Sequence, residues 1–401
     1  MAQEWLRVPI GRDAGPWRTA ATQRVVLAVV HTVASAGHVL DAVELLESDR
    51  RIQVVFTQAP DLFSNGVREH LRALGGVVIP WHQATQTDFD LVLAADCSGV
   101  HELHGPVVML SHGVVNNKVA PAALGGPASG LVVGLGAPWL TWYGRLVPAA
   151  VAVSHRQVIP VLAQQCPQAV PVAIVTGDLC LDRLSASAPH RDAYRRALGV
   201  PERHMVVAVS STWGPDSLLG RSWRMLFDLL HQLPESTYSV RVTMHPAAWF
   251  GHGPRQVMGW LRQHRRAGLR LVEPTSWRGL VTAADVLIGD HGSATTYAAA
   301  IGVPVLRSPT PPGSTAPGSA TELLARTAPA LAPDRPLSAQ LDAAILAARR
   351  HPNAPVAAAI SSEPGRAAGL LRAHLYRLAA LSEPTGGCAA APVGPPVLVD
   401  E

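Results

Sequence analysis

The 401-residue sequence is short of several features that would place a protein in a particular class. Its four cysteines include no pair at CxxC spacing, which predicts neither a zinc site nor a disulfide framework and is typical of the reducing cytoplasm. No run of about 18 apolar residues occurs, so no transmembrane helix is predicted. The N-terminus lacks the apolar core of a signal peptide. We therefore expect a cytoplasmic protein without a transmembrane segment.

Charged residues are scarce as well, at 15%, and Lys118 is the only lysine. The 33 basic and 29 acidic residues leave a net charge of +4. So small an excess permits anionic ligands but does not indicate nucleic acid, and no nucleic-acid-binding motif is present. Hydrophobic residues make up 48%, as in globular proteins, and the length is sufficient for two domains with separate cores.

Apolar segments alternate with helical patterns along most of the chain. The clearest expected strands are 24–31, 52–58, 149–155, 205–213, 238–246 and 284–290. Strands that are joined by helices pair in parallel, so the sequence predicts an α/β protein with doubly wound sheets. The stretch 176–204 contains no strand pattern and separates two Rossmann-like halves.

These patterns predict five segments in chain order. They are an N-terminal extension (1–22), an N-terminal Rossmann-like domain (23–180), a C-terminal Rossmann-like domain (181–362), a C-terminal amphipathic helix (363–382) and a tail (383–401). The tail, SEPTGGCAAAPVGPPVLVDE, has low complexity, and we expect it to be disordered.

The stretch DHGSATTYAAA, which begins at Asp290, joins an expected strand to an expected helix. Ligands of doubly wound sheets bind beyond the carboxyl ends of the strands, where N–H groups at helix N-termini favour phosphate. Gly292 would let the backbone approach a ligand closely, and Ser293 and Thr295 would add hydroxyl donors. Together with Ala294 these residues predict a pyrophosphate cradle. The alternative is an ordinary helix start capped by a serine.

Two histidines also lie at the ends of expected strands. His112 and Gly113 end one strand, with Asn117 and Lys118 close behind, and His245 ends another. A histidine can take a proton from an attacking hydroxyl or donate to a phosphate, because its pKa lies near neutral pH. Lys118 could meet an anion. The alternative is that each histidine is structural, with its nitrogens bonded to nearby backbone.

Five motifs in order resemble a known family. They are SHGVVNNK, TGDLCLDRL, SSTWGPD, the His245-Pro246 pair and GDHGSATTYAAAIGVPVL. Their order and spacing over about residues 25–310 resemble the CDP-glycerol glycerophosphotransferases, which are the teichoic acid primases and polymerases. The resemblance implies the GT-B fold, in which two Rossmann-like domains face a central cleft.

The resemblance also implies how substrates would bind. A nucleotide-activated donor, CDP- or UDP-linked, would lie on the C-terminal half, with its pyrophosphate on Gly292, Ser293 and Ala294 and a further contact from Thr212. A hydroxyl-bearing acceptor would lie on the N-terminal half. Contact with a membrane surface is compatible with the sequence, which does not indicate an oligomeric state.

The catalytic roles follow from the same resemblance. His112 would act as the base on the acceptor hydroxyl, and His245 would stabilise charge on the phosphate or leaving group. His31, at the first strand-to-helix turn, would either line the cleft or be structural. No metal or other cofactor is expected.

The sequence departs from the family motifs at several positions. Ser111 stands where the family has Trp, Gly214 where it has Arg, and His291-Gly292 where it has Tyr-Ser. The phosphate cradle would survive these changes, whereas the contacts to a polyol or sugar would differ. Two alternatives therefore remain: a nucleotide-sugar glycosyltransferase or UDP-GlcNAc 2-epimerase-like enzyme, and a non-catalytic GT-B protein that binds a nucleotide or a protein partner.

Overall fold

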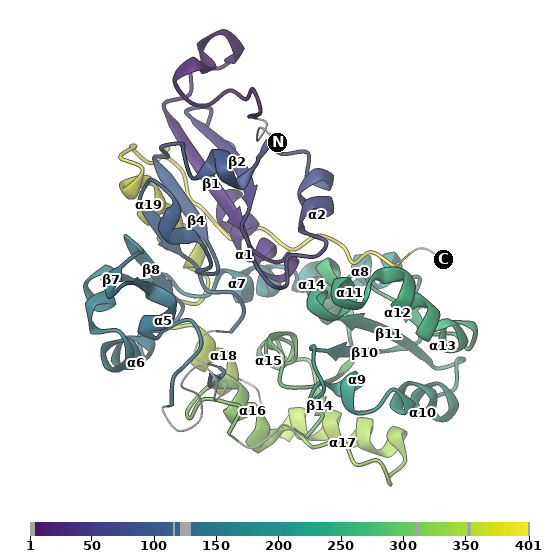
Figure 1. The fold of residues 1–401 in the computed structure, drawn as a ribbon. Helices are drawn as coiled ribbons and strands as arrows, with labels where there is room; N and C mark the ends of the chain where they lie inside the picture. Colours follow the sequence, from purple (N-terminus) through teal and green to yellow (C-terminus); the bar gives the residue numbers. More distant parts are fainter. Residues whose placement is uncertain (1–4, 115–116, 121–129, 310–312, 351–353, 400–401) are drawn as a thin grey trace. The chain divides into compact units, whose positions relative to one another are not determined.

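The computed structural model describes residues 5–114, 117–120, 130–309, 313–350 and 354–399 (Figure 1). The chain divides into two compact units, which we call unit 1 and unit 2. Unit 1 comprises 1–115, 131–180 and 362–390, and unit 2 comprises 116–130, 181–361 and 391–401. The chain passes from unit 1 to unit 2 between Cys180 and Leu181, where the sequence analysis placed the domain boundary. The described residues 117–120 and 130 differ from the expected division, because they belong to unit 2.

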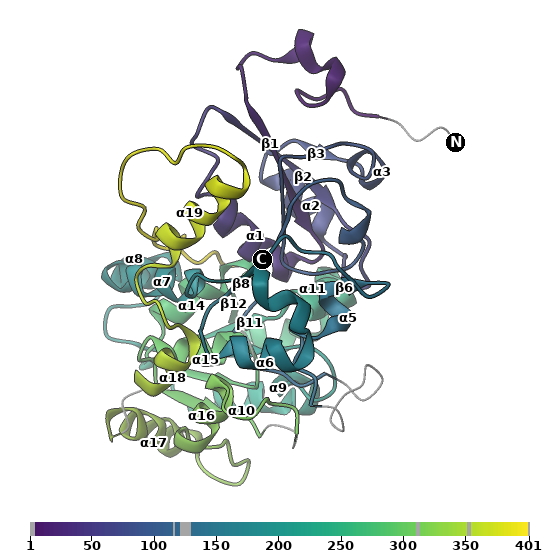
Figure 2. The ribbon, with the colours of Figure 1, turned by 90° about the vertical axis from the view of Figure 1, so that its left-hand side faces the viewer.

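Unit 1 is built on a seven-stranded parallel sheet in the order β3-β2-β1-β4-β5-β8-β9 (Figures 1 and 2). Its strands are β1 (Arg24–Val30), β2 (Ile52–Gln58), β3 (Val78–Ile79), β4 (Leu91–Ala94), β5 (Val107–Met109), β8 (Ala150–Val153) and β9 (Ala173–Val175). A small hairpin of β6 (Thr141–Trp142) and β7 (Arg145–Leu146) precedes β8. The β1 side chains are buried from Val26 onward, because this central strand is covered on both faces.

The helices of unit 1 follow the strands. They are α1 (Val33–Val43), α2 (Val67–Ala73), α3 (Trp81–Ala84), α5 (Ala137–Leu140), α6 (Val158–Gln165) and α19 (Ala367–Leu378), and α7 (Leu179–Ala186) leads into unit 2. Helix α1 begins with a capping box, in which Thr32 and Ser35 bond each other's backbone N–H groups. The N-terminal extension contains a 3₁₀ turn (Arg12–Trp17).

Unit 2 contains a five-stranded parallel sheet in the order β12-β11-β10-β13-β14. The strands are β10 (Met205–Ser211), β11 (Tyr238–Met244), β12 (Arg270–Leu271), β13 (Val286–Gly289) and β14 (Val305–Arg307). The helices are α8 (Arg191–Ala197), α9 (Leu218–Arg221), α10 (Arg224–Gln232), α11 (Pro246–His252), α12 (Pro254–Trp260), α13 (Arg262–Arg266), α14 (Trp277–Ala283), α15 (Ser293–Ala300), α16 (Ala320–Thr327), α17 (Leu337–Arg350) and α18 (Ala354–Ile360). Two parallel sheets interleaved with helices confirm the predicted α/β class.

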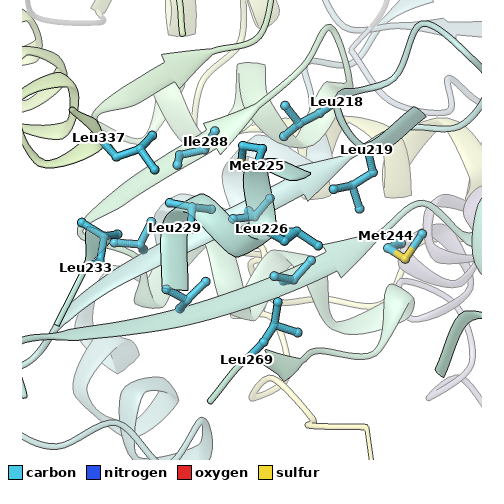
Figure 3. Packing of buried hydrophobic residues seen from close by; sticks show 14 of the residues in the cluster. Leu218, Leu219, Met225, Leu226, Leu229, Leu233, Met244, Leu269, Ile288 and Leu337 are labelled. Atoms are coloured by element: carbon cyan, nitrogen blue, oxygen red, sulfur yellow. The ribbon is translucent and has the colours of Figure 1, made fainter. Parts of the chain in front are cut away.

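The core of unit 2 lies between this sheet and α10 and α17. Figure 3 shows Leu226 and Leu229 of α10 beside the strands, with Ile288 of β13 and Leu337 of α17 in the same cluster. Burying each such side chain contributes about 1.5–3 kcal/mol relative to exposure. This core holds the carboxyl ends of β10, β11 and β13 in place.

The C-terminal tail differs from the sequence analysis. Expected disorder over 383–401 is wrong for the last described residues, which pack on unit 2: Val399 N–H donates to Leu271 O over 2.9 Å, and Val393 N–H donates to Ser187 Oγ over 2.9 Å. The tail thereby hydrogen-bonds to the sheet edge at β12, which would otherwise present unpaired backbone groups. Low complexity alone did not reveal this long-range partner.

Candidate functional site

Asp290 follows β13 and connects two loops of unit 2. Its Oδ2 accepts hydrogen bonds from Thr212 N–H (2.8 Å), Thr212 Oγ1 (2.9 Å) and Leu218 N–H (2.9 Å). Its Oδ1 accepts one from Gly292 N–H over 3.1 Å. The structure thus brings the predicted residues Asp290 and Thr212 together, but the carboxylate is engaged with protein donors. We assign Asp290 to holding the β10–α9 and β13–α15 loops rather than to a ligand contact.

Gly292 is the N-cap of α15, and it supplies no side-chain cap to the helix. A Cβ on Gly292 would lie 2.4 Å from Thr212 Cγ2, so the close approach of Thr212 requires glycine here. The first-turn N–H groups of a helix have no intrahelical acceptor, and Ser293 and Ala294 occupy that first turn, partly exposed. The positive end of the α15 dipole therefore reaches the surface where the cradle was predicted.

Thr295 does not take the role that was predicted for it. Its side chain is 2% exposed and packs over Gly289, where an added Cβ would lie 2.2 Å from Thr295 Oγ1. The hydroxyl therefore faces strand β13, because the third residue of a helix has turned toward the core. Thr295 helps to seat α15 on the sheet.

Lys118 belongs to unit 2, although it follows a strand of unit 1 in sequence. Its segment pairs with residues 314–316: Lys118 forms an antiparallel bridge with Thr315, and Ala316 N–H donates to Asn117 O over 3.0 Å. Asn117 Oδ1 also accepts from Thr321 N–H at the start of α16 over 3.1 Å. Asn117 is therefore an anchor for the segment that carries Lys118.

This anchoring brings the Lys118 ammonium close to Asp290. Burial lowers the pKa of Lys118, and the charge of Asp290 acts in the opposite direction. Within the part of the chain that the structure describes, the ammonium makes no hydrogen bond or ion pair. A half-buried ammonium without a partner in the described ranges is costly, and an anion at the start of α15 would offset that cost.

His291 is a residue of this site that the sequence analysis did not select. Its Nδ1 is buried and, among the described residues, has no hydrogen-bond partner. Burial lowers the pKa of His291, with Lys118 and Arg221 acting in the same direction and Asp290 and Asp216 opposing them. The imidazole is accordingly neutral at pH 7. The one sequence signal for it was its replacement of the family's tyrosine.

His245 ends β11 and caps α11. Its backbone N–H donates to Ser211 O over 2.9 Å, which ties it to the end of β10. Its Nδ1 accepts from Ala247 N–H over 3.1 Å. A neutral imidazole whose Nδ1 is an acceptor carries its proton on Nε2, so His245 has the tautomer that can donate to an anion.

In unit 1, His112 is exposed after β5. Its Nδ1 lies 2.9 Å from Ala95 O, which can only accept, so Nδ1 carries the proton and Nε2 keeps its lone pair. This is the tautomer of a general base. The neighbouring Gly113 N–H donates to His38 Nε2 over 3.0 Å, so helix α1 braces the turn. The local sequence does not encode either of these contacts.

His31 is fully buried at the end of β1, so the expectation that it lines a cleft is wrong. Its Nε2 lies 2.8 Å from Ser98 O. Burial lowers the pKa of His31, Asp96 opposes this, and His112 acts with burial. His31 is therefore a buried structural residue that lies close enough to His112 for their charges to interact. Over the described residues, no group of three His, Cys, Asp or Glu side chains is placed to hold a metal ion.

Likewise, none of the helices in the described ranges is long and apolar enough to cross a membrane.

No family model matches this sequence, and no curated protein does. Solved structures do: the wall teichoic acid polymerase TagF, in a variant soaked with CDPG, matches with a TM-score of 0.60 at 10% identity over 89% of each chain. TagF without CDPG matches with a TM-score of 0.58 at 10% identity over the same share of both chains. A UDP complex of HepE from Anabaena covers 89% of this chain and 100% of its own at 14% identity, with a TM-score of 0.46. At such identities the likeness to TagF concerns the fold, and it confirms the predicted GT-B class of two Rossmann-like units.

Proposed function

We propose that this protein is a GT-B transferase whose donor is activated by a nucleotide diphosphate, bound to unit 2 at the start of α15. The observation that carries the proposal is the ammonium of Lys118, which has no hydrogen-bond or ion-pair partner among the described residues and lies near a helix N-terminus that lacks a side-chain cap. The dipole of α15, its first N–H groups and Lys118 all favour a dianion at one place. The fold shared with TagF, whose structure was soaked with CDPG, agrees with this proposal.

The proposed reaction uses two histidines, His112 and His245, whose tautomers are set by hydrogen bonds. An acceptor hydroxyl loses its proton to Nε2 of His112 and attacks the transferred group of the donor. The bond from that group to the nucleotide phosphate breaks, and the electron pair stays on the phosphate oxygen. Lys118, the α15 N–H groups and His245 Nε2–H stabilise the charge on that oxygen. Each such donor can be worth about 3–4 kcal/mol in the transition state.

Two donor classes remain, and they differ in the bond that breaks. A CDP-linked polyol phosphate would transfer its phosphoryl group and release CMP, which is the reaction implied by the family resemblance. A nucleotide sugar would transfer its glycosyl group and release a nucleoside diphosphate. The second class is favoured by the Gly292-Ser293 turn and by His291, where the sequence departs from the glycerophosphotransferase motif.

Thermal shift with a panel of CMP, CDP, CDP-glycerol, UDP, UDP-GlcNAc, GDP and dTDP tests the proposal. A ligand at 100 times its Kd stabilises the fold by about 2.7 kcal/mol. We expect Lys118→Met to weaken the binding by roughly 10–100-fold, since charge-assisted hydrogen bonds are worth about 1.5–3 kcal/mol. The matched variant Lys118→Arg keeps the charge and should retain most of the affinity.

The pattern of the responses distinguishes the alternatives. A response confined to cytidine nucleotides supports the glycerophosphotransferase-like reaction, and a response to UDP or dTDP supports a nucleotide-sugar enzyme. The absence of a thermal shift with every nucleotide of the panel would contradict the proposed donor site and favour a non-catalytic GT-B protein. Equal nucleotide affinities of the wild type and Lys118→Met would show that Lys118 does not contact the nucleotide.

A further inference from the structure

The hairpin of β6 and β7 in unit 1 presents aromatic side chains to solvent. Figures 1 and 2 show β7 and β6 close to helix α5. Tyr143 at its tip is 90% exposed, and Trp142 beside it is 49% exposed. The turn residues Tyr143 and Gly144 have φ of 46° and 73°, and positive φ at both positions is the signature of a type I′ turn. Neither residue takes part in the site proposed above.

Tyr143 is an unfavourable choice for this turn. The first central position of a type I′ turn favours Asn, Asp or Gly, because other side chains enter the left-handed region at a cost. The sequence nevertheless places a large aromatic ring there, with nothing from the core to cover it. A strained backbone position that keeps a costly residue is a reason to look for function.

The hairpin is also held firmly enough to present this ring. His101 stacks on Trp142, with ring centroids 3.6 Å apart and planes at 16°. Trp142 in turn meets Tyr143 edge to face at 5.0 Å. At the base of the hairpin, Val147 N–H donates to Leu140 O over 3.0 Å. The aromatic tip is therefore a fixed protrusion.

We infer that this hairpin docks onto the interface of a phospholipid bilayer. Its shape argues against a small-molecule ligand, because such ligands bind in concave sites, whereas Tyr143 projects from a tip. Its size argues against a protein partner: two aromatic side chains expose on the order of 300 Å², while a stable protein interface needs about 800 Å² from each partner. A bilayer needs no complementary surface to accept two rings.

The chemistry of the tip fits the same occupant. Trp and Tyr rings have an apolar body and a polar end, and they concentrate at the boundary between headgroups and acyl chains. Arg145 follows on the hairpin, exposed, and forms no ion pair with any residue in the described ranges. Its guanidinium can pair with lipid phosphate, which favours anionic headgroups.

Sedimentation with vesicles tests this inference on the full chain. The vesicles contain phosphatidylcholine alone or phosphatidylcholine with phosphatidylglycerol. We expect the wild type to bind, more tightly to the anionic vesicles, and Tyr143→Asn to bind about tenfold more weakly. Asn suits the turn better than Tyr, so the Tm of this variant should equal or exceed that of the wild type. A loss of binding therefore cannot be attributed to misfolding.

Trp260 provides a matched control, because this unit 2 indole is 44% exposed. Trp260→Thr should bind vesicles as the wild type does, whereas Trp142→Thr should bind weakly. The inference is overturned if the wild type does not bind vesicles, if Tyr143→Asn binds equally well, or if Trp260→Thr loses as much. It is also overturned if Tyr143→Asn converts a dimer to a monomer. Nucleotide binding by Tyr143→Asn should be unchanged, so this test is independent of the proposed donor site.

Discussion

Removal of the Asp290 carboxylate should destabilise unit 2 strongly. Asp290 is 5% exposed and accepts hydrogen bonds from Thr212 N–H, Thr212 Oγ1, Leu218 N–H and Gly292 N–H. Asp290→Ala leaves three backbone N–H groups in a buried position without an acceptor. Each stranded buried donor costs about 1–3 kcal/mol, and the Thr212 hydroxyl can rotate to another partner. We expect a loss of about 3–5 kcal/mol in the free energy of unfolding, because water entering the gap relieves part of the sum.

A conservative variant and an exposed control variant test whether the loss comes from the buried hydrogen bonds of Asp290. Asp290→Asn keeps one acceptor oxygen and should lose less, about 1–2 kcal/mol. Asp216→Ala is the matched control: this aspartate has a side chain that is 61% exposed and pairs with Arg221 over 2.9 Å. An exposed ion pair of this kind contributes about 0–1 kcal/mol.

Urea unfolding of the full chain, followed by circular dichroism, measures these losses. The reasoning is refuted if Asp290→Ala unfolds within about 1 kcal/mol of the wild type, since the stranded donors would then have found other acceptors. Equal losses for Asp290→Ala and Asp216→Ala would refute it as well, because burial would then not matter.

Three other predictions concern the same unit. Gly292→Ala places a Cβ 2.4 Å from Thr212 Cγ2, so the β13–α15 loop must shift. Nucleotide binding in the thermal-shift panel should weaken about tenfold. Unchanged affinity would show that nucleotide binding does not depend on the position of this loop. Burial opposes the charged form of Asp285, but a β10 N–H group and two arginines of α8 outweigh it and hold the pKa of this carboxyl below its usual value. This stabilisation is present above about pH 4 and is lost as the pH falls through the lowered pKa. Asp285→Asn should therefore lose about 1–3 kcal/mol in the free energy of urea unfolding at pH 7 and less in acid. A loss that stays constant from pH 7 to 3 would contradict a stabilising role of the Asp285 carboxylate. Burial lowers the pKa of His291, and a bound phosphate would raise it. Affinity for a nucleotide diphosphate should therefore increase from about pH 8 to 6 in the wild type relative to His291→Asn, and parallel pH profiles would argue against a contact with His291.

Much of the fold was predictable from local sequence. Apolar runs alternating with helical patterns encode strands and helices through their different periods, and strands joined by helices must pair in parallel. The carboxyl ends of parallel strands lie at one edge, so polar residues directly after the strands could be proposed as site residues from their positions alone. Asp290, Gly292, His245 and, in unit 1, His112 were proposed in this way. The structure gives Asp290 the role of holding two loops, and the roles of the other three stay predictions.

The roles of individual side chains depended on contacts that the local sequence does not encode. Thr295 and His31 looked accessible because they follow strands, but the packing of α15 and the burial of the β1 end enclose them. The opposite holds for Tyr143, which lies between strands of only two residues each, too short for a periodic pattern to reveal a hairpin.

Lys118 shows most clearly which properties the sequence determines and which depend on the tertiary structure. The sequence by itself determined that the chain has one lysine and that it follows His112 closely. Only the tertiary structure decided that it serves the other unit, through the bond between Asn117 and Thr321, which lie 204 residues apart. The packed C-terminal tail is a second case. Periodicity and turn chemistry act over a few residues and specify elements, whereas the partner of a loop or a tail depends on which distant backbone is left with unpaired groups once the sheets have formed.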